Sequence, residues 1–150
     1  MDEKDRMIIK MLQEDGDVTN AVLGNTVGLS GPAVHERLKR LKAGGIIMGN
    51  RLIVNPEAIG RSLLSFVLLK TNGSQKRSQV VQLEQIPEIE EIHSTAGQFS
   101  ILLKVRTKSP ADMEELYERI YEIPGISASE TIIVFKSFLE RPTYVPDQVQ

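Results

Sequence analysis

A helix stop and a helix start lie only two residues apart in the first third of the chain, and this pair of signals constrains the fold most. Thr19 can cap a helix that Gly28 ends in a left-handed conformation, and Ser30 can cap the next helix. Pro32 suits the first turn of that helix, where backbone N–H groups lack helical partners. Two short helices joined by such a turn form a helix-turn-helix.

The neighbouring segments extend this unit. Apolar residues at helical intervals predict helices over residues 5–14 and 20–27 and a third helix that ends at Gly44. Short apolar runs on either side of a Gly-Asn pair predict a two-stranded wing over residues 46–54. Residues 1–54 are therefore expected to form a winged helix-turn-helix domain within an α+β chain.

Positive charge is concentrated on the third predicted helix and the wing, although the whole chain has a formal net charge of −2. Residues 30–51 contain five cations and one anion, a net charge of +4, whereas residues 61–150 contain ten cations and twelve anions, a net charge of −2. Duplex DNA fits this local excess as a partner, because its phosphates attract cations. The residues expected to contact DNA are Ser30, Gly31, Pro32, Ala33, His35, Glu36, Arg37, Lys39, Arg40 and Arg51.

These residues are expected to divide into two roles. The small residues 31–33 let the helix start approach the floor of the major groove, and free N–H groups there suit a phosphate. His35 is best placed to read base edges, while the four basic residues of the set hold the DNA backbone. The alternative is a solvated basic helix face without a nucleic-acid partner. The order of helix, turn, basic helix and wing favours DNA binding.

The rest of the chain alternates strands and helices. Strands are predicted over residues 61–70, 89–95, 99–106 and 129–138, and helices over 74–86 and from Ser109-Pro110 onward. This βαββαβ order predicts a ferredoxin-like domain over residues 62–140. Residues 55–61 then form a short linker, and residues 141–150 form an irregular tail that is expected to lie on a partner subunit.

One face of the predicted sheet has no helix to cover it. Alternation in the first and last strands leaves apolar side chains on both faces, among them Leu64, Phe66, Leu68 and Ile132. Because such a face would not remain in water, we expect a homodimer that buries sheet against sheet. A dimer also supplies two reading helices, whereas one helix reads only a few base pairs at about 1–3 kcal/mol each.

Four motifs follow one another along the first third of the chain. They are Asp5 with MLQEDG at residues 11–16, VGLSGPAV at 27–34, RLKRL at 37–41 and GIIMG at 45–49. In this order they resemble the Lrp/AsnC (feast/famine) family of prokaryotic transcriptional regulators. The resemblance implies a winged helix-turn-helix, a RAM/ACT-like ferredoxin domain, and dimers that assemble into tetramers or octamers. Two departures are Lys42, where the family usually has Glu, and Asn50, where an aromatic residue is common.

The resemblance also implies an effector site, usually for an amino acid, near the loop between the second and third strands. The matching residues are Thr95, Ala96, Gly97, Gln98, Phe99 and Ser100. The family motif is Gly-x-aromatic-Asp, and Ser100 stands here in place of the aspartate that would suit an effector's ammonium group. The alternative is that Gly97 only makes a tight hairpin turn.

Other functional classes find little support. The sequence contains no P-loop, Gly-x-Ser-x-Gly or Gly-x-Gly-x-x-Gly motif, so no catalytic site is expected. It has no cysteine and only two separated histidines, so no metal or other cofactor is expected, and a reducing cytoplasm suits it. No membrane partner is expected, since no apolar run could span a bilayer. An architectural DNA-compacting protein and a ferredoxin-like sensor without DNA binding stay open as alternatives.

Overall fold

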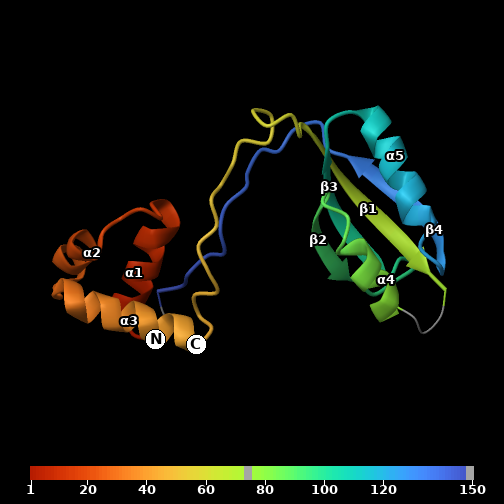
Figure 1. Cartoon of the computed structure of the whole chain (residues 1–150). Helices are drawn as coiled ribbons and strands as arrows, with labels where there is room; N and C mark the ends of the chain where they lie inside the picture. Colours follow the sequence, from red (N-terminus) through yellow and green to blue (C-terminus); the bar gives the residue numbers. More distant parts are fainter. Residues whose placement is uncertain (73–75, 148–150) are drawn as a thin grey trace. The chain divides into compact units, whose positions relative to one another are not determined.

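The computed structural model describes residues 1–72 and 76–147, and within them the chain forms two compact units (Figure 1). The first unit contains residues 1–53 together with the described end of the chain from Leu139, and the second contains residues 54–138. The first unit is helical, whereas the second is built on a sheet. The end of the chain thus returns to the first unit, which no pattern in the sequence indicates.

Three helices form the first unit, and a side-chain cap marks the start of each. They are α1 (Glu3–Glu14), α2 (Asn20–Val27) and α3 (Gly31–Ala43). Thr19 and Ser30 cap α2 and α3, as predicted, because their hydroxyls accept hydrogen bonds from the N–H groups of Val22 and Ala33. The buried core of this unit consists of Ile8, Leu23, Val27 and Val34. The predicted helix-turn-helix is therefore confirmed.

The turn between α2 and α3 brings two stretches of backbone into contact. Gly28 has a φ of 67°, and its N–H donates to the carbonyl of Gly24, to which the N–H of Leu29 also donates at 2.8 Å. A Cβ built on Gly24 would lie 2.4 Å from the carbonyl oxygen of Leu29. Only glycine therefore fits at residue 24 without a shift of the backbone.

The segment expected to form the wing contains no strand. Residues 46–54 are irregular throughout, and Met48, Leu52 and Ile53 are 89–96% exposed. This corrects the expected pair of strands. Each arm offers only two or three strand-forming residues, and an isolated two-stranded hairpin is marginally stable without a third strand or a packed face.

A buried aspartate joins α1 to α3. The Asp5 side chain is 1% exposed, and its carboxylate accepts hydrogen bonds from Arg37 at 2.8 Å and from Arg40 at 2.9 and 3.1 Å. Arg37 also pairs with Asp2, the residue that caps α1. We call Asp2, Asp5, Arg37 and Arg40 the α1–α3 clamp, because these charge-assisted hydrogen bonds hold α3 at a defined place on the unit.

The clamp keeps its carboxylates charged. Burial acts to raise the pKa of Asp5, but hydrogen bonds from the Asp2 backbone N–H and the Arg37 guanidinium outweigh it and hold that pKa below its usual range. The hydrogen bond from Arg37 likewise lowers the pKa of Asp2. A lowered carboxyl pKa stabilises the fold above the unfolded pKa, and this stabilisation is lost as the pH falls through the folded pKa.

The described end of the chain lies against α1. Gln13 Nε2 donates to the carbonyl oxygen of Thr143 at 2.9 Å, and Lys10 forms an ion pair with Asp147. Residues 141–147 contain neither helix nor strand. The part of the expected tail that the structure describes is thus irregular, but it contacts its own α1 where a partner subunit was expected. Residues 148–150 lie outside the described residues.

The second unit has the predicted βαββαβ order. Its elements are β1 (Leu63–Thr71), α4 (Lys76–Leu83), β2 (Ile89–Ser94), β3 (Ile101–Thr107), α5 (Pro110–Tyr121) and β4 (Ile126–Ile133). The sheet is antiparallel with the strand order β2-β3-β1-β4, which is the ferredoxin-like arrangement. β4 starts at Ile126 and ends at Ile133, earlier than the expected range 129–138, because Ile126 already pairs with Thr71 across a register shift. The first two residues of the helix expected over 74–86 lie outside the described residues.

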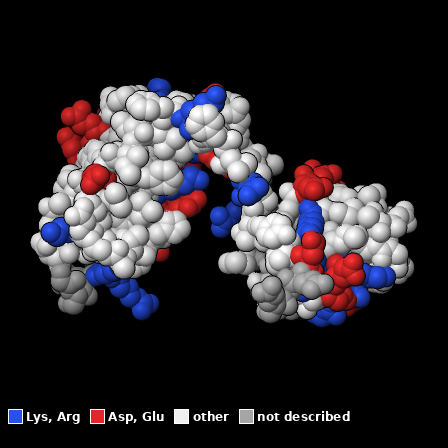
Figure 2. Space-filling model, turned by 180° about the vertical axis from the view of Figure 1, so that it is seen from behind, with Lys and Arg blue, Asp and Glu red and all other residues white. Residues whose placement is uncertain are grey.

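Both helices cover the same face of the sheet (Figure 1). The buried residues between them are Val67, Leu69, Ile101, Leu103 and Val105 from the strands and Leu83, Met113, Leu116 and Ile120 from the helices. The opposite face carries Phe66, Leu68 and Leu102, which the strand register places side by side. Figure 2 shows this unit from behind, on the left, with few charged side chains on the side in view. The structure thus decides which of the two apolar sets is left without a helix.

Replacing Gly24 by alanine is expected to loosen the helix-turn-helix. The new Cβ would force the Leu29 carbonyl to move, and we expect a loss of about 1–3 kcal/mol in the unfolding free energy of the first unit. Chemical denaturation followed by far-UV circular dichroism measures this loss. Gly16→Ala is the matched control, because a Cβ there meets no atom within 4 Å. Equal stability of the two variants would contradict the close approach.

Replacing Asp5 by asparagine is expected to destabilise the first unit by about 2–3 kcal/mol, because the charge-assisted hydrogen bonds to both arginines are weakened. Hydrogen exchange followed by mass spectrometry on peptides of α1 and α3 reports this change separately from the second unit.

The pH dependence provides a control for this substitution. The stability difference between the native chain and Asp5→Asn should be full at pH 7 and begin to shrink as the pH falls below about 4, the ordinary carboxyl pKa of the unfolded chain. It should be lost once the pH has fallen through the lower folded pKa of Asp5. If the difference in unfolding free energy stayed constant down to pH 2, the contacts of Asp5 with the two arginines would depend on packing and not on the charge of the carboxylate.

Candidate DNA interface and effector loop

The start of α3 is an open surface. Six of the residues expected to contact DNA lie there, namely Ser30, Gly31, Pro32, Ala33, His35 and Glu36. Pro32, His35 and Glu36 are exposed, whereas Gly31 and Ala33 are half-buried. The first turn therefore presents small side chains, and the Gly31 N–H is its one backbone donor without a partner among the described residues, because Pro32 has no N–H and Ser30 accepts from Ala33 and Val34. Such a surface can approach a groove or a phosphate closely.

The four cations expected to hold the DNA backbone fall into two groups. Lys39 and Arg51 are exposed, and neither forms an ion pair with any other residue that the structure describes. Arg37 and Arg40 instead belong to the α1–α3 clamp. Lys42, which follows the expected set on α3, is exposed and also lacks an ion pair within the described ranges.

The clamp changes the charge that this surface offers to a partner. The Arg37 side chain is 23% exposed and bonded to two carboxylates, so it acts first in holding α3 to α1. Arg40 retains 64% exposure and can still be reached from solvent. With Asp2 and Asp5 counted, the five cations face three anions, and the net charge is +2 instead of +4. Lys39 and Lys42 supply the uncompensated charge of α3.

Sequence reasoning did not identify the acidic half of the clamp. Asp2 and Asp5 stand three residues apart at a helix start, and each side chain accepts from the backbone N–H of the other in a capping box. That spacing is a local signal for the cap. The pairing of Asp5 with α3 joins residues 32 and 35 positions apart, for which the sequence has no local signal.

The expected wing residue, Arg51, is exposed and lies outside any helix or strand. No hydrogen bond or ion pair among the described residues joins Arg51 to α3. The structure thus brings the residues of the α3 start together with Lys39 on one helix, whereas Arg51 lies in the irregular segment that follows it.

The six expected effector residues, Thr95–Ser100, lie together in the loop between β2 and β3. The Thr95 N–H donates to the Ser100 carbonyl at 3.1 Å, and the Thr95 hydroxyl donates to the Phe99 carbonyl at 2.9 Å. The Ser100 hydroxyl bonds to the hydroxyl of Thr71 on β1 at 2.8 Å. Gly97 has a φ of 128°, which favours glycine and agrees with its expected role in a tight turn. The loop is therefore held by its own polar groups.

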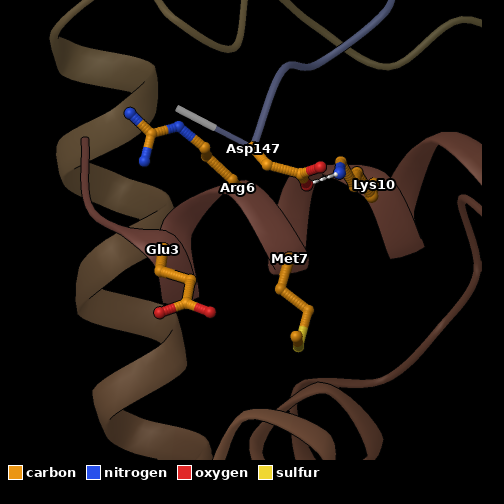
Figure 3. Close-up of a pocket in the computed structure, with 5 residues that line it drawn as sticks. All are labelled: Glu3, Arg6, Met7, Lys10 and Asp147. Carbon is orange, nitrogen blue, oxygen red and sulfur yellow. Dashed lines mark hydrogen bonds and ion pairs between the residues drawn. The ribbon is translucent and has the colours of Figure 1, made fainter. Parts of the chain in front are cut away.

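A surface hollow of about 370 Å³ lies elsewhere, on α1 (Figure 3). It is lined by Glu3, Arg6, Met7, Lys10 and Asp147, and it contains none of the expected site residues. Within residues 1–72 and 76–147, no group of three or more His, Asp or Glu side chains could hold a metal ion. None of the helices in these ranges has the length and apolarity needed to cross a membrane.

Two protein-family models match the chain. The Lrp/AsnC ligand binding domain matches residues 64–144, and a winged helix-turn-helix DNA-binding domain matches residues 1–48. The HTH-type transcriptional regulator FL11 of Pyrococcus abyssi is 36% identical over 140 residues, which cover 93% of each chain.

Solved structures resemble the chain over nearly its whole length. The structure of Escherichia coli AsnC has a TM-score of 0.90 and 30% identity, and it covers 97% of this chain and 99% of that one. A feast or famine regulatory protein of Mycobacterium tuberculosis, solved in complex with L-methionine, also has a TM-score of 0.90, with 33% identity and coverage of 97% and 99%.

These matches agree with the two units described above. One family model alone covers more than half of the chain, and the FL11 relative matches 93% of it. The named relatives are transcriptional regulators and not enzymes. The chain therefore belongs to the Lrp/AsnC family of transcriptional regulators, with a winged helix-turn-helix DNA-binding domain followed by the ligand-binding domain of that family.

Proposed function

We propose that this regulator reads duplex DNA with the first turns of α3. The open start of α3, held in place by the clamp, is the single observation that carries this proposal. Ser30, Pro32, His35 and Glu36 are exposed there, and the Ser30 hydroxyl is used in the cap, so the other three are the candidates for contact with base edges. Lys39 and Lys42 lie one to two turns further on and hold phosphates.

The remaining expected contacts rank below these. Arg40 is exposed enough to reach a phosphate while it stays bonded to Asp5, whereas Arg37 acts mainly within the clamp. Arg51 requires the segment 46–54 to become ordered on DNA. This ranking differs from the charge count alone, which treats all five cations of the region as equivalent.

We also propose that the protein binds DNA as a dimer. Phe66 and Leu68 on β1 and Leu102 on β3 share the face that no helix covers, and Ile132 of β4 extends it across the sheet. Ion pairs of Lys104 and Arg106 with Glu90 and Glu91 lie along β2 and β3. The same face also carries Lys104 opposite Phe66 and Glu130 opposite Leu68. A second copy of this sheet offers a matching, largely apolar surface and doubles the number of reading helices. The family resemblance adds tetramers or octamers of such dimers.

A small effector is proposed to control DNA binding. The second unit matches a ligand-binding domain, and a related protein of Mycobacterium tuberculosis holds L-methionine. The loop over residues 95–100 is the proposed effector site. A ligand that binds one arrangement of the assembly more tightly than another shifts the population toward it, and this alters the spacing of the two α3 helices. We place this activity in the cytoplasm, where the protein would be bound to DNA.

Replacing Lys39 by alanine is expected to weaken DNA binding and to reduce the salt dependence by about 0.9 in log–log slope, as for the loss of one phosphate contact. Lys42→Ala should behave in the same way. The probe is a duplex selected from a random library by the native protein, and the affinity is measured by fluorescence anisotropy between 50 and about 300 mM salt.

Lys108→Ala is the matched control, because this exposed cation belongs to the second unit. Selection of a defined, pseudo-palindromic duplex supports a site-specific regulator. Even binding to every duplex in the library would instead favour the architectural alternative, and unchanged slopes for both lysine variants would exclude α3 as the phosphate-binding helix.

The dimer is expected to depend on the uncovered face of the sheet. Sedimentation at micromolar concentration should give twice the 16.7 kDa chain mass, or a multiple of it. Leu68→Lys should lower that mass, because the new charge would be buried between sheets. The lysine would stand beside Glu130 of β4, which the register places opposite residue 68, so the fold of the unit should survive.

Val81→Lys is the control for this substitution, since Val81 is exposed on α4, on the other side of the sheet. A native chain that sediments as a monomer would contradict the proposed dimer. A Leu68→Lys chain that keeps the native mass would place the interface elsewhere.

A further inference from the structure

The start of α1 lies beside the turn and the helix that are proposed to read DNA. Asp2 caps α1, and its carboxylate accepts a hydrogen bond from Arg37 of α3 at 2.5 Å. Lys4 donates to the carbonyl of Gly28, in the turn between α2 and α3, at 3.3 Å. Residues 2–5 therefore contact both α3 and the turn that precedes it, and they bring an acidic group to this surface.

The two aspartates of the α1–α3 clamp differ in exposure and in what they hold. The Asp5 side chain is 1% exposed and bonds to both arginines, so it fixes the place of α3. The Asp2 side chain is 51% exposed and pairs with Arg37. An ion pair with an exposed partner contributes little to stability, because water and salt screen it. Asp2 thus adds little to the hold on α3, and another anion can reach the same place from solvent.

Arg37 has hydrogen-bond donors that the clamp does not use. Its Nη1 donates to both Asp2 and Asp5, whereas its Nε and Nη2 form no hydrogen bond with the parts of the chain that the structure describes. A phosphate oxygen is an anionic acceptor like a carboxylate oxygen, and arginine binds both through the same planar group of donors. A DNA phosphate can therefore take the place of Asp2 at Arg37 while Asp5 still holds the guanidinium.

Asp2 opposes such a phosphate because it is charged. The hydrogen bond from Arg37 is the main cause that lowers the pKa of Asp2, so the carboxylate is ionised at neutral pH. An ionised carboxylate at Arg37 occupies a donor and also repels a phosphate that approaches the same group. Arg37 stands on α3 two residues beyond His35, next to the turns proposed to enter the groove.

We propose that Asp2 limits the DNA affinity of α3 by competing with a DNA phosphate for Arg37. Asp5 positions the helix, whereas Asp2 sets how many phosphate contacts each subunit makes. Fewer phosphate contacts weaken binding to every duplex, so contacts with base edges supply a larger share of the remaining affinity. This inference rests on the proposed role of α3 in DNA binding.

The test is Asp2→Asn in the full chain. Asparagine caps a helix about as well as aspartate, so this change keeps the cap of α1 and removes only the charge. DNA affinity is measured by fluorescence anisotropy with the duplex selected by the native protein. The slope of log affinity against log salt should become steeper by about 0.9 for each Arg37 that gains a phosphate. Affinity should rise at low salt, and for one such contact this gain should shrink about threefold between roughly 50 and 200 mM salt.

Two further variants assign the effect to the contact between Asp2 and Arg37. Glu3→Gln is the matched control, because Glu3 is the neighbouring exposed anion and its side chain forms no hydrogen bond or ion pair with the described residues. It should keep the native slope. Adding Arg37→Gln to Asp2→Asn should return the slope to the native value, because the arginine that gains the phosphate is gone. Far-UV circular dichroism checks that each variant is folded.

Either of two results would overturn the inference. One is an Asp2→Asn slope equal to the native slope, with binding to the duplex intact. The other is an equal steepening in Glu3→Gln, which would show that the charge acts at a distance and not through Arg37. Both results leave the proposed function standing, because the protein still binds DNA in each case. A native chain that binds no duplex would instead refute the proposed function itself.

Discussion

The position of α3 depends on the buried carboxylate of Asp5. A buried charge destabilises a fold unless partners compensate it, and Arg37 and Arg40 supply that compensation from one side of α3. The apolar residues that α3 packs inward are Val34 and Leu41, which are buried, and Leu38, which is half-buried. The ion pairs therefore fix the orientation of α3, which a small apolar core alone would leave less well defined. A helix that must present its first turns to DNA gains a fixed orientation from this arrangement.

Because Arg37 and Arg40 bind carboxylates within the first unit, its surface offers less free positive charge to DNA than the sequence suggests. Cations on an exposed helix suggest phosphate contacts, but two of them here serve the fold first. The net charge available to a partner is smaller than the sequence count, and it sits on Lys39 and Lys42. DNA affinity should then rest on few phosphate contacts per subunit. A second copy of the reading helix becomes correspondingly more important.

In the second unit, the surface proposed for the dimer and the loop proposed for the effector lie at different places: the first on the uncovered face of the sheet, the second at one end of it. The helices and the buried strand residues form the core on one face, and the uncovered face offers Phe66, Leu68 and Leu102 to a second copy. The effector loop lies at one end of the sheet, where β2 turns into β3. Loops on a rigid sheet can change chemistry without changing the fold.

Much of this could be predicted because the signals are local. Thr19 and Ser30 cap helices through hydrogen bonds that span three residues, and Gly28 ends a helix by its own conformation. The alternation of apolar residues likewise identified the strands, and the open start of α3 followed from the cap and Pro32. The strands of the wing were the exception: a winged helix-turn-helix model matches residues 1–48, but the two short apolar arms over residues 46–54 do not pair in the structure.

The sequence by itself thus determined the order of elements, their caps and the residues at the start of α3. Only the tertiary structure decided that Arg37 and Arg40 bind Asp5, that Gly24 touches the Leu29 carbonyl, and that the chain end returns to α1. It also decided which apolar set of β1 the helices bury. The reason is physical: caps and periodicity depend on neighbours within a few residues, whereas these contacts exist only after distant segments have packed together.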